Sequence, residues 1–211
     1  MISHKTLPST LCNKLIHILN SFLVIFGIEL KHVNTNPSNG SPNSSLLNLF
    51  TDISLGYSHT CGIIENGSVY CWGQNSNGEL GDSTTDHSNL PVYSKLPAGS
   101  KAVAISSGHY HNCAIMGNSS VYCWGYNGHG QLGNGNQTSM NVPVYVGIPI
   151  GSNPVQISSS HRHTCTVMDN GSMYCWGYND NEQVEGPVTE NLGNYVNNPT
   201  FVSTKFNNRV V

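Results

Sequence analysis

The chain has 211 residues, and only 9% of them are Asp, Glu, Lys or Arg, against about 25% in typical globular domains. Its net charge is −3 and its eight basic residues are scattered, which argues against nucleic-acid binding because tracking phosphates needs clustered Lys and Arg. Abundant Gly and Asn indicate many turns and favour an all-β chain.

Residues 1–32 contain an apolar run at 15–28 that follows Lys5 and Lys14. A run of this length predicts an N-terminal apolar helix that acts as a signal peptide. No clear A-x-A cleavage site follows it, so an uncleaved signal anchor in the membrane is the close alternative. A buried helix or a misassigned start codon are the alternatives without export. Residues 33–47 are polar and low in complexity, and we expect them to form a disordered linker.

Three copies of a 52-residue repeat follow, at residues 48–98, 99–151 and 152–206. A period of this length is typical of a repeat architecture. Two series of cysteines and the three tryptophans of the chain share the spacing: Cys61, Cys113 and Cys165; Cys71, Cys123 and Cys175; Trp72, Trp124 and Trp176. Pro91 and Pro143 also correspond, whereas the matching Pro199 comes four residues late. Glu182 and Glu185 replace glycines in the third copy, which indicates a divergent terminal repeat.

Each copy contains a segment that predicts a β-hairpin, at 59–73, 111–125 and 163–177. In the first copy a three-residue loop would place Gly67 at a left-handed position. Ser119 replaces this glycine in the second copy, so a different turn is expected there. The loop length puts the two cysteines of each copy opposite each other, within disulfide range.

The cysteine pairs are therefore predicted to be disulfides: Cys61–Cys71, Cys113–Cys123 and Cys165–Cys175. Reduced cysteines that pack as small hydrophobes are the second interpretation. A zinc site that combines a pair with His59 is a distant third, because the spacing is not CxxC. His59, His111 and His163 recur before each first cysteine, and we interpret them as structural hydrogen-bonding groups.

Both faces of each hairpin are apolar, so each hairpin must lie between neighbours, as blades do in a propeller. Trp72, Trp124 and Trp176 are expected to fill the blade core, with an aromatic ligand cage as the less favoured alternative. Asp82, Asp86 and Asp180 lack the pattern of a calcium loop. Neither a cofactor nor a metal ion is predicted.

The pattern G-x-x-H-x-C-x-(I/V), followed by G-S-(V/M)-Y-C-W-G-x-N-x-x-G-(Q/E)-L-G, resembles the repeat of the regulator of chromosome condensation family. The paired cysteines resemble the extracytoplasmic form of that repeat. The resemblance covers about residues 48–205 and implies an all-β fold, a partial β-propeller of three four-stranded blades. Because members of the family usually have seven blades, the chain is expected to be a fragment of a larger propeller, to self-associate into a ring, or to cap a partner's incomplete propeller.

No paired carboxylates, phosphate-binding loop or nucleophile motif stands out, so we predict a non-enzymatic module that binds a protein partner of unknown identity. Export and the cysteine pairs place it outside the cell, in a periplasm or at a cell surface. The loops at 74–90 and 126–142, with Tyr126 and His129, are the candidate binding residues. The alternatives are a guanine-nucleotide exchange factor for a small GTPase, as the founding family member is, and an appended domain of a larger cell-surface protein.

Overall fold

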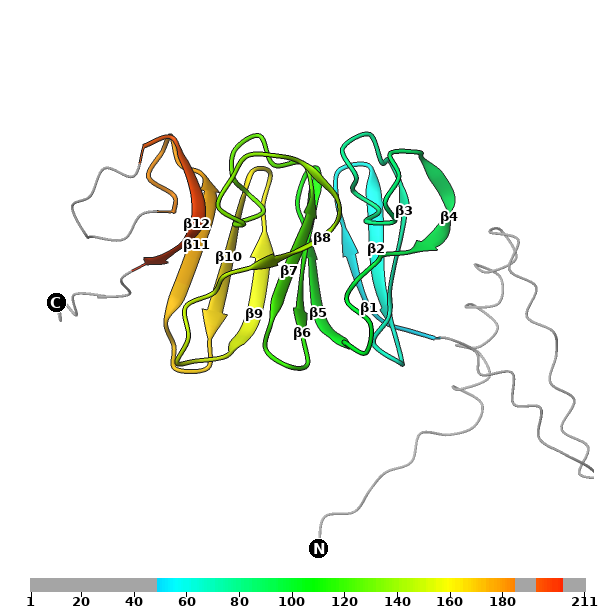
Figure 1. The fold of residues 1–211 in the computed structure, drawn as a ribbon, viewed down its shortest axis with the longest axis horizontal. Helices are drawn as coiled ribbons and strands as arrows, with labels where there is room; N and C mark the ends of the chain where they lie inside the picture. Colours follow the sequence, from blue (N-terminus) through cyan, green and yellow to red (C-terminus); the bar gives the residue numbers. More distant parts are fainter. Residues whose placement is uncertain (1–48, 185–192, 203–211) are drawn as a thin grey trace, which may run out of the picture. The chain divides into compact units, whose positions relative to one another are not determined.

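The computed structural model describes residues 49–184 and 193–202. The predicted N-terminal helix, the polar linker and the end of the third repeat lie outside these ranges. The described residues form twelve strands and contain no helix. The strands make three four-stranded antiparallel sheets, each in chain order (Figure 1). The prediction of an all-β fold with three four-stranded blades is confirmed.

Each sheet is one blade, and blade 2 lies between the other two (Figure 1). Blade 1 consists of β1 (Phe50–Leu55), β2 (His59–Ile64), β3 (Val69–Gly73) and β4 (Ser88–Tyr93). Blade 2 consists of β5 (Ala102–Ser107), β6 (His111–Met116), β7 (Val121–Gly125) and β8 (Met140–Val146). Blade 3 consists of β9 (Pro154–Ser159), β10 (His163–Met168), β11 (Met173–Tyr178) and β12 (Tyr195–Val202).

The first strands of neighbouring blades contact one another, β1 with β5 and β5 with β9, and the fourth strands lie at the opposite edges of the sheets. Cys71 pairs with Val92, Cys123 with Val144 and Cys175 with Thr200. This register makes Pro91, Pro143 and Pro199 equivalent, so the match predicted for Pro199 is confirmed. Proline has no N–H to donate, which suits an edge strand and discourages pairing with another sheet.

The three hairpin turns have the same conformation. Gly67 and Gly171 adopt φ angles of 84° and 81°, and Ser119 adopts 67°. The closing hydrogen bond, in which the Ile64 N–H donates to the Ser68 carbonyl at 3.0 Å, recurs from Met116 to Ser120 at 2.8 Å. The expectation of a different turn at Ser119 is wrong, because the hairpin register requires the left-handed residue whatever side chain it carries.

The turns place the two cysteines of each blade directly opposite each other. Their Cα atoms are 4.1 Å apart in all three blades. The sulfur atoms lie at disulfide distance, 2.07 Å for Cys61–Cys71 and for Cys113–Cys123, and 2.12 Å for Cys165–Cys175. The first two pairs are fully buried, whereas Cys165 in blade 3 is half-buried.

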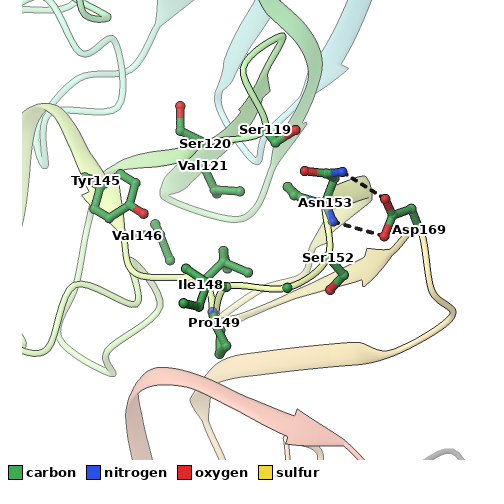
Figure 2. Close-up of a pocket in the computed structure, with 13 residues that line it drawn as sticks. Ser119, Ser120, Val121, Tyr145, Val146, Ile148, Pro149, Ser152, Asn153 and Asp169 are labelled. Atoms are coloured by element: carbon green, nitrogen blue, oxygen red, sulfur yellow. Dashed lines mark hydrogen bonds between the residues drawn. The ribbon is translucent and has the colours of Figure 1, made fainter.

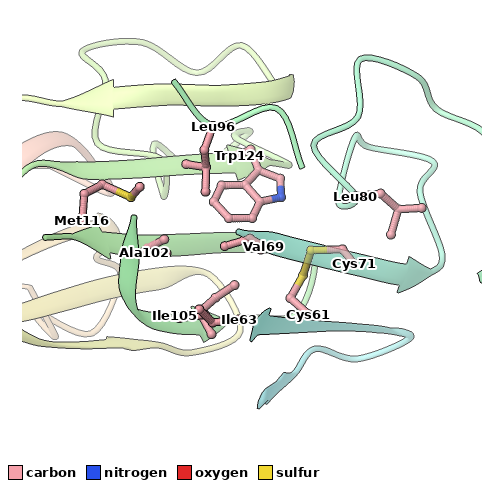
Figure 3. Close-up of a cluster of buried hydrophobic side chains, with 11 residues drawn as sticks. Cys61, Ile63, Val69, Cys71, Leu80, Leu96, Ala102, Ile105, Met116 and Trp124 are labelled. Atoms are coloured by element: carbon pink, nitrogen blue, oxygen red, sulfur yellow. A yellow bond between two sulfur atoms is a disulfide. The ribbon is translucent and has the colours of Figure 1, made fainter. Parts of the chain in front are cut away.

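The blades stack through unlike faces. The face of blade 1 that carries the disulfide packs on the face of blade 2 that carries the tryptophan (Figure 3). We name these the Cys face and the Trp face of a blade. One continuous core joins them, formed by the Cys-face residues Cys61, Ile63, Val69 and Cys71 together with the Trp-face residues Ile105, Ala114, Met116 and Trp124. The Cys face of blade 2 packs on Trp176 of blade 3 in the same way.

The tryptophans therefore lie between blades and not within the core of a single blade. Trp124 and Trp176 are fully buried, and their indole N–H groups donate to the backbone carbonyls of Glu79 and Gln131 in the preceding blade, at 2.8 and 2.9 Å. Trp72 is only half-buried and packs against Phe50, with 5.8 Å between ring centres. The expectation that all three tryptophans fill a blade core is therefore corrected in two ways. Trp124 and Trp176 fill the junctions between blades, and Trp72 is less buried because no described blade covers the Trp face of blade 1.

Polar contacts repeat at the two junctions as well. The Nε2 atom of His59 lies 2.8 Å from Oδ1 of Asn112, and Nε2 of His111 lies 2.8 Å from Oγ1 of Thr164. Asn112 and Thr164 also donate to the carbonyls that accept from the tryptophans, those of Glu79 and Gln131. His59 and His111 thus bind one blade to the next, whereas the His163 ring pairs with Ser160 in its own blade.

The hairpin turns give a paired prediction. Gly67→Ala should lower the free energy of unfolding by at least about 1–2 kcal/mol, which is the cost of a left-handed L residue. The close approach of the new Cβ atom to Cβ of Lys101, at 2.5 Å, should add to this loss. Ser119→Gly should raise it by about 0.5–1 kcal/mol, since glycine removes the same cost at some loss of chain entropy. Urea denaturation of both variants measures this. A destabilised Ser119→Gly protein would contradict the account of the turn.

The junction histidines predict an acid-sensitive fold. Burial, and then the neighbouring His59, lower the pKa of His111 from 6.5 to about 3. Between these values the unfolded chain binds a proton at this site that the native protein does not. The free energy of unfolding should therefore be undiminished above about pH 6.5 and fall as the pH drops toward 3, by up to about 1.4 kcal/mol per pH unit for this group.

His111→Gln keeps an amide beside Thr164 but does not titrate. The variant should be less stable at pH 7.5 and should lose less stability than the parent on going to pH 4. Urea denaturation at a series of pH values is the measurement. Parallel curves for the parent and the variant would show that His111 does not cause the acid sensitivity.

Candidate protein-binding surface

The loops that join the first two strands of each blade place three rings in a row at one end of the molecule. Tyr57, His109 and His161 occupy equivalent positions, 52 residues apart. The ring centre of His109 lies 4.0 Å from that of Tyr57 and 4.0 Å from that of His161. Backbone contacts support the row, because the Tyr57 N–H donates to the His109 carbonyl and the His109 N–H to the Ser160 carbonyl.

In blades 1 and 2, glycine just before the row lets the loop lie close over a junction histidine. A Cβ atom at Gly56 would lie 2.1 Å from the His59 ring, and one at Gly108 would lie 2.3 Å from the His111 ring. These contacts connect the loop surface to the blade junction beneath it, so the row of rings keeps the register of the stacked blades.

A second group of aromatic residues extends the surface from the loop between the third and fourth strands. Tyr126 and His129 lie 5.8 Å apart at their ring centres, and His129 also contacts Tyr178 and Tyr195. A depression with a volume of about 280 Å³ lies among these groups. Its lining consists of Asn77, His109, Tyr110, Tyr126, His129, His161 and Arg162.

Buried asparagines organise the long loops. The Asn127 Oδ1 atom accepts from the Leu132 N–H at 2.9 Å, and its Nδ2 group donates to the carbonyls of Asn136 and Thr138 at 2.9 and 3.1 Å. Asn75 makes the corresponding contacts with Leu80, Thr84 and Asp86 in blade 1. Both residues are fully buried. Long loops that are fixed in this way present their side chains at little further cost in entropy.

Arg162 supplies a positive charge to the surface, and its guanidinium lies 5.6 Å from the centre of the Tyr178 ring. Burial is the main cause that lowers the pKa of His109, and His161 and Arg162 lower it further. Burial and Arg162 also lower the pKa of His129, although Asp180 opposes this. At neutral pH the surface therefore combines the charge of Arg162 with the uncharged imidazoles of His109 and His129.

The structure brings together the two binding residues predicted from the sequence, Tyr126 and His129. Of the two predicted loops, 126–142 supplies both rings, whereas 74–90 contributes Asn77. Five further residues of the surface were not predicted: Tyr57, His109, His161, Tyr110 and Arg162. A signal was available for three of them, because Tyr57, His109 and His161 lie two residues before the recurring histidine in every copy.

No group of three or more His, Cys, Asp or Glu residues in the described part of the chain is arranged to hold a metal ion. No helix in it is long and apolar enough to cross a membrane. A depression of about 400 Å³ near the hairpin end contains Tyr145, Ile148 and Asn153, and the Asn153 backbone and side-chain amides donate to Asp169 (Figure 2). This pair fastens the connection between blades 2 and 3 to a hairpin.

Stacked four-stranded blades define the chain as part of a β-propeller of the repeat type. Two models described as the regulator of chromosome condensation (RCC1) repeat match it. One matches residues 66–115 and 118–167, and the other matches 50–79, 102–131 and 155–183. The chain belongs to the RCC1 repeat family, and the predicted resemblance is confirmed.

Curated relatives are much longer than the matched region. The ultraviolet-B receptor UVR8 of Arabidopsis thaliana is 30% identical over 132 residues, which cover 63% of this chain and 30% of the receptor. The probable E3 ubiquitin-protein ligase HERC6 of Homo sapiens is 31% identical over 150 residues, which cover 68% of this chain and 14% of the ligase. The chain thus spans less than a third of either relative.

Solved structures show the same fold. Yeast RCC1 (Prp20), in a structure in which it is bound to Kap60, matches with a TM-score of 0.64 at 21% identity, over 75% of this chain and 38% of the other. Human WBSCR16 matches with a TM-score of 0.65 at 18% identity, over 76% and 41%. Three blades therefore correspond to about two fifths of these structures.

Proposed function

We propose that the chain is a non-enzymatic protein-binding module and that its loop end is the binding surface. The observation that carries this proposal is the continuous aromatic surface built by equivalent loops of three blades, from Tyr57 through His109 to His161. Tyrosine and arginine are enriched where proteins bind one another, because they combine large contact areas with polar ends. Rigid loops favour binding further, since little freedom remains to be lost.

The structural relatives support a role in protein binding. One was solved in complex with Kap60, and the crystal structure of Prp20p from Saccharomyces cerevisiae was described together with its binding properties to Gsp1p and histones. We propose that this chain likewise binds a protein, through its own loop residues. Whether it works alone or as an appended part of a larger cell-surface protein, the binding surface is the same.

Binding should depend on the side chains that line the depression. Tyr126→Ser and Arg162→Ser should each reduce the yield of specifically captured proteins at least about tenfold, the effect of losing about 1.4 kcal/mol of binding energy. Tyr145→Ser is the matched control, because Tyr145 is 56% exposed on β8, outside the loop surface. Quantitative affinity capture from the native source, with thermal unfolding to verify the fold, is the measurement. Equal capture by all four proteins would overturn the assignment of the surface.

A guanine-nucleotide exchange factor is the alternative that this experiment also tests. If a small GTPase is captured through the loop surface and its nucleotide release is accelerated, the exchange function replaces the proposed one. No observation on the described residues favours nucleotide exchange, so it enters only as one of the results that the capture experiment can give.

We further propose that the module works outside the cytoplasm, either secreted or held at a cell surface. Three cysteine pairs at disulfide distance support this location, because disulfides persist in oxidising compartments and are rare in the cytosol. The predicted export signal in residues 1–32 points the same way but lies outside the described residues.

Intact mass after alkylation tests the location. In protein isolated from its native source, the six paired cysteines should resist alkylation under denaturing conditions until they are reduced. Free alkylation of all six without reduction would contradict a location outside the cytoplasm and would strengthen the intracellular alternative.

A further inference from the structure

The two outer blades present the two unlike halves of a blade junction. Blades 1 and 3 lie at the two ends of the stack (Figure 1). The core contacts leave the Trp face of blade 1 and the Cys face of blade 3 without a described blade to cover them. Trp72 is half-buried, whereas its equivalents Trp124 and Trp176 are fully buried. On blade 3, Cys165 and Met173 are half-buried beside Cys175, Val184 and Val196.

The polar groups on these end faces match as well. At the junction of blades 2 and 3, His111 pairs with Thr164, and Trp176 donates to the carbonyl of Gln131. The 52-residue period makes His163 and Gln183 of blade 3 equivalent to His111 and Gln131. It also makes Thr60 and Trp72 of blade 1 equivalent to Thr164 and Trp176. The two ends thus hold the same histidine–threonine and tryptophan–glutamine pairs, one half at each end.

We propose that two copies of the chain associate head to tail and close a six-bladed ring. In each of its two junctions, the Cys face of blade 3 in one copy covers the Trp face of blade 1 in the other. Six blades fall within the usual range of about four to eight for propellers. We assign a second copy as the partner because the chain already makes the contact between a Cys face and a Trp face twice, and it presents one further face of each kind. Two Trp faces could not pair in this way, because their indole N–H groups would meet without an acceptor.

One position in the third repeat differs in sequence from its equivalents at the internal junctions. Trp124 and Trp176 lie against Gly81 and Gly133, where a Cβ atom would come within 2.9 and 2.7 Å of the indole. The third repeat has Glu185 at this position, outside the described residues.

Sedimentation velocity over a concentration series tests the proposal with the full 211-residue chain. The expected result is an equilibrium between the 22.8 kDa chain and a species of twice that mass. Tryptophan emission should shift to shorter wavelength as the pair forms, because Trp72 becomes buried. Trp72→Arg and Met173→Arg should each remain monomeric, whereas Tyr145→Arg, a substitution at an exposed position on the outer strand of blade 2, should associate like the parent.

Mixing the two monomeric variants is the decisive step. The Trp72→Arg protein keeps an intact Cys face and the Met173→Arg protein keeps an intact Trp face, so together they should form one heterodimer through a single junction. Circular dichroism establishes that each variant is folded before mixing.

Three results would overturn the proposal. A parent chain that stays monomeric at all concentrations would show that a different protein or further blades cover the faces. Association of Met173→Arg alone would indicate pairing of like faces. An open series of increasing masses would rule out closure of the ring, because a head-to-tail contact that does not close produces a filament. None of these results bears on the loop surface, which is tested separately.

Discussion

The contact between a Cys face and a Trp face is the interaction on which the rest of the molecule depends. A single hairpin is marginal in water, and each blade here is apolar on both sides of its central strands. Packing between two neighbouring blades stabilises the hairpin and removes both apolar faces from water. The indole that fills the junction also donates to a backbone carbonyl of the preceding blade, so the apolar contact has a fixed orientation and a fixed register.

That register determines where the candidate binding residues lie. Because each junction positions the next blade in the same way, residues 52 positions apart in the sequence come side by side at the loop end, as Tyr57, His109 and His161 do. Backbone hydrogen bonds between neighbouring loops also support this continuous surface. In blades 1 and 2, Gly56 and Gly108 let the loops lie on the junction histidines. The scaffold and the binding surface are therefore two consequences of one repeated contact, and the identity of the loop side chains is free to differ between blades.

Much of the blade could be predicted from the sequence, because its determinants are local. The loop length places Cys61 opposite Cys71, and the spacing of the tryptophans gives the period. The location of the tryptophans between blades could not be predicted, since it depends on which face meets which neighbour, and both faces are apolar. The buried Asn75 and Asn127 were missed for a related reason. An asparagine after Trp-Gly indicates a turn, but only the folded loop shows that the side chain binds carbonyls nine and eleven residues away.

The position of the histidines connects stability and surface chemistry. His59 and His111 lie inside the junctions, and Tyr57 and His109 lie in the loops directly above them. Burial lowers the pKa of His111 and of His109. Protonation in acid has different effects in the junction and on the loop surface. A proton on His111 adds a charge to a fully buried site and opposes stacking of the blades, whereas a proton on His109 adds a charge beside Arg162 on the surface. Because the loop lies on the junction, acid that loosens the blades also alters the surface they carry, and binding and folding cannot respond to pH independently.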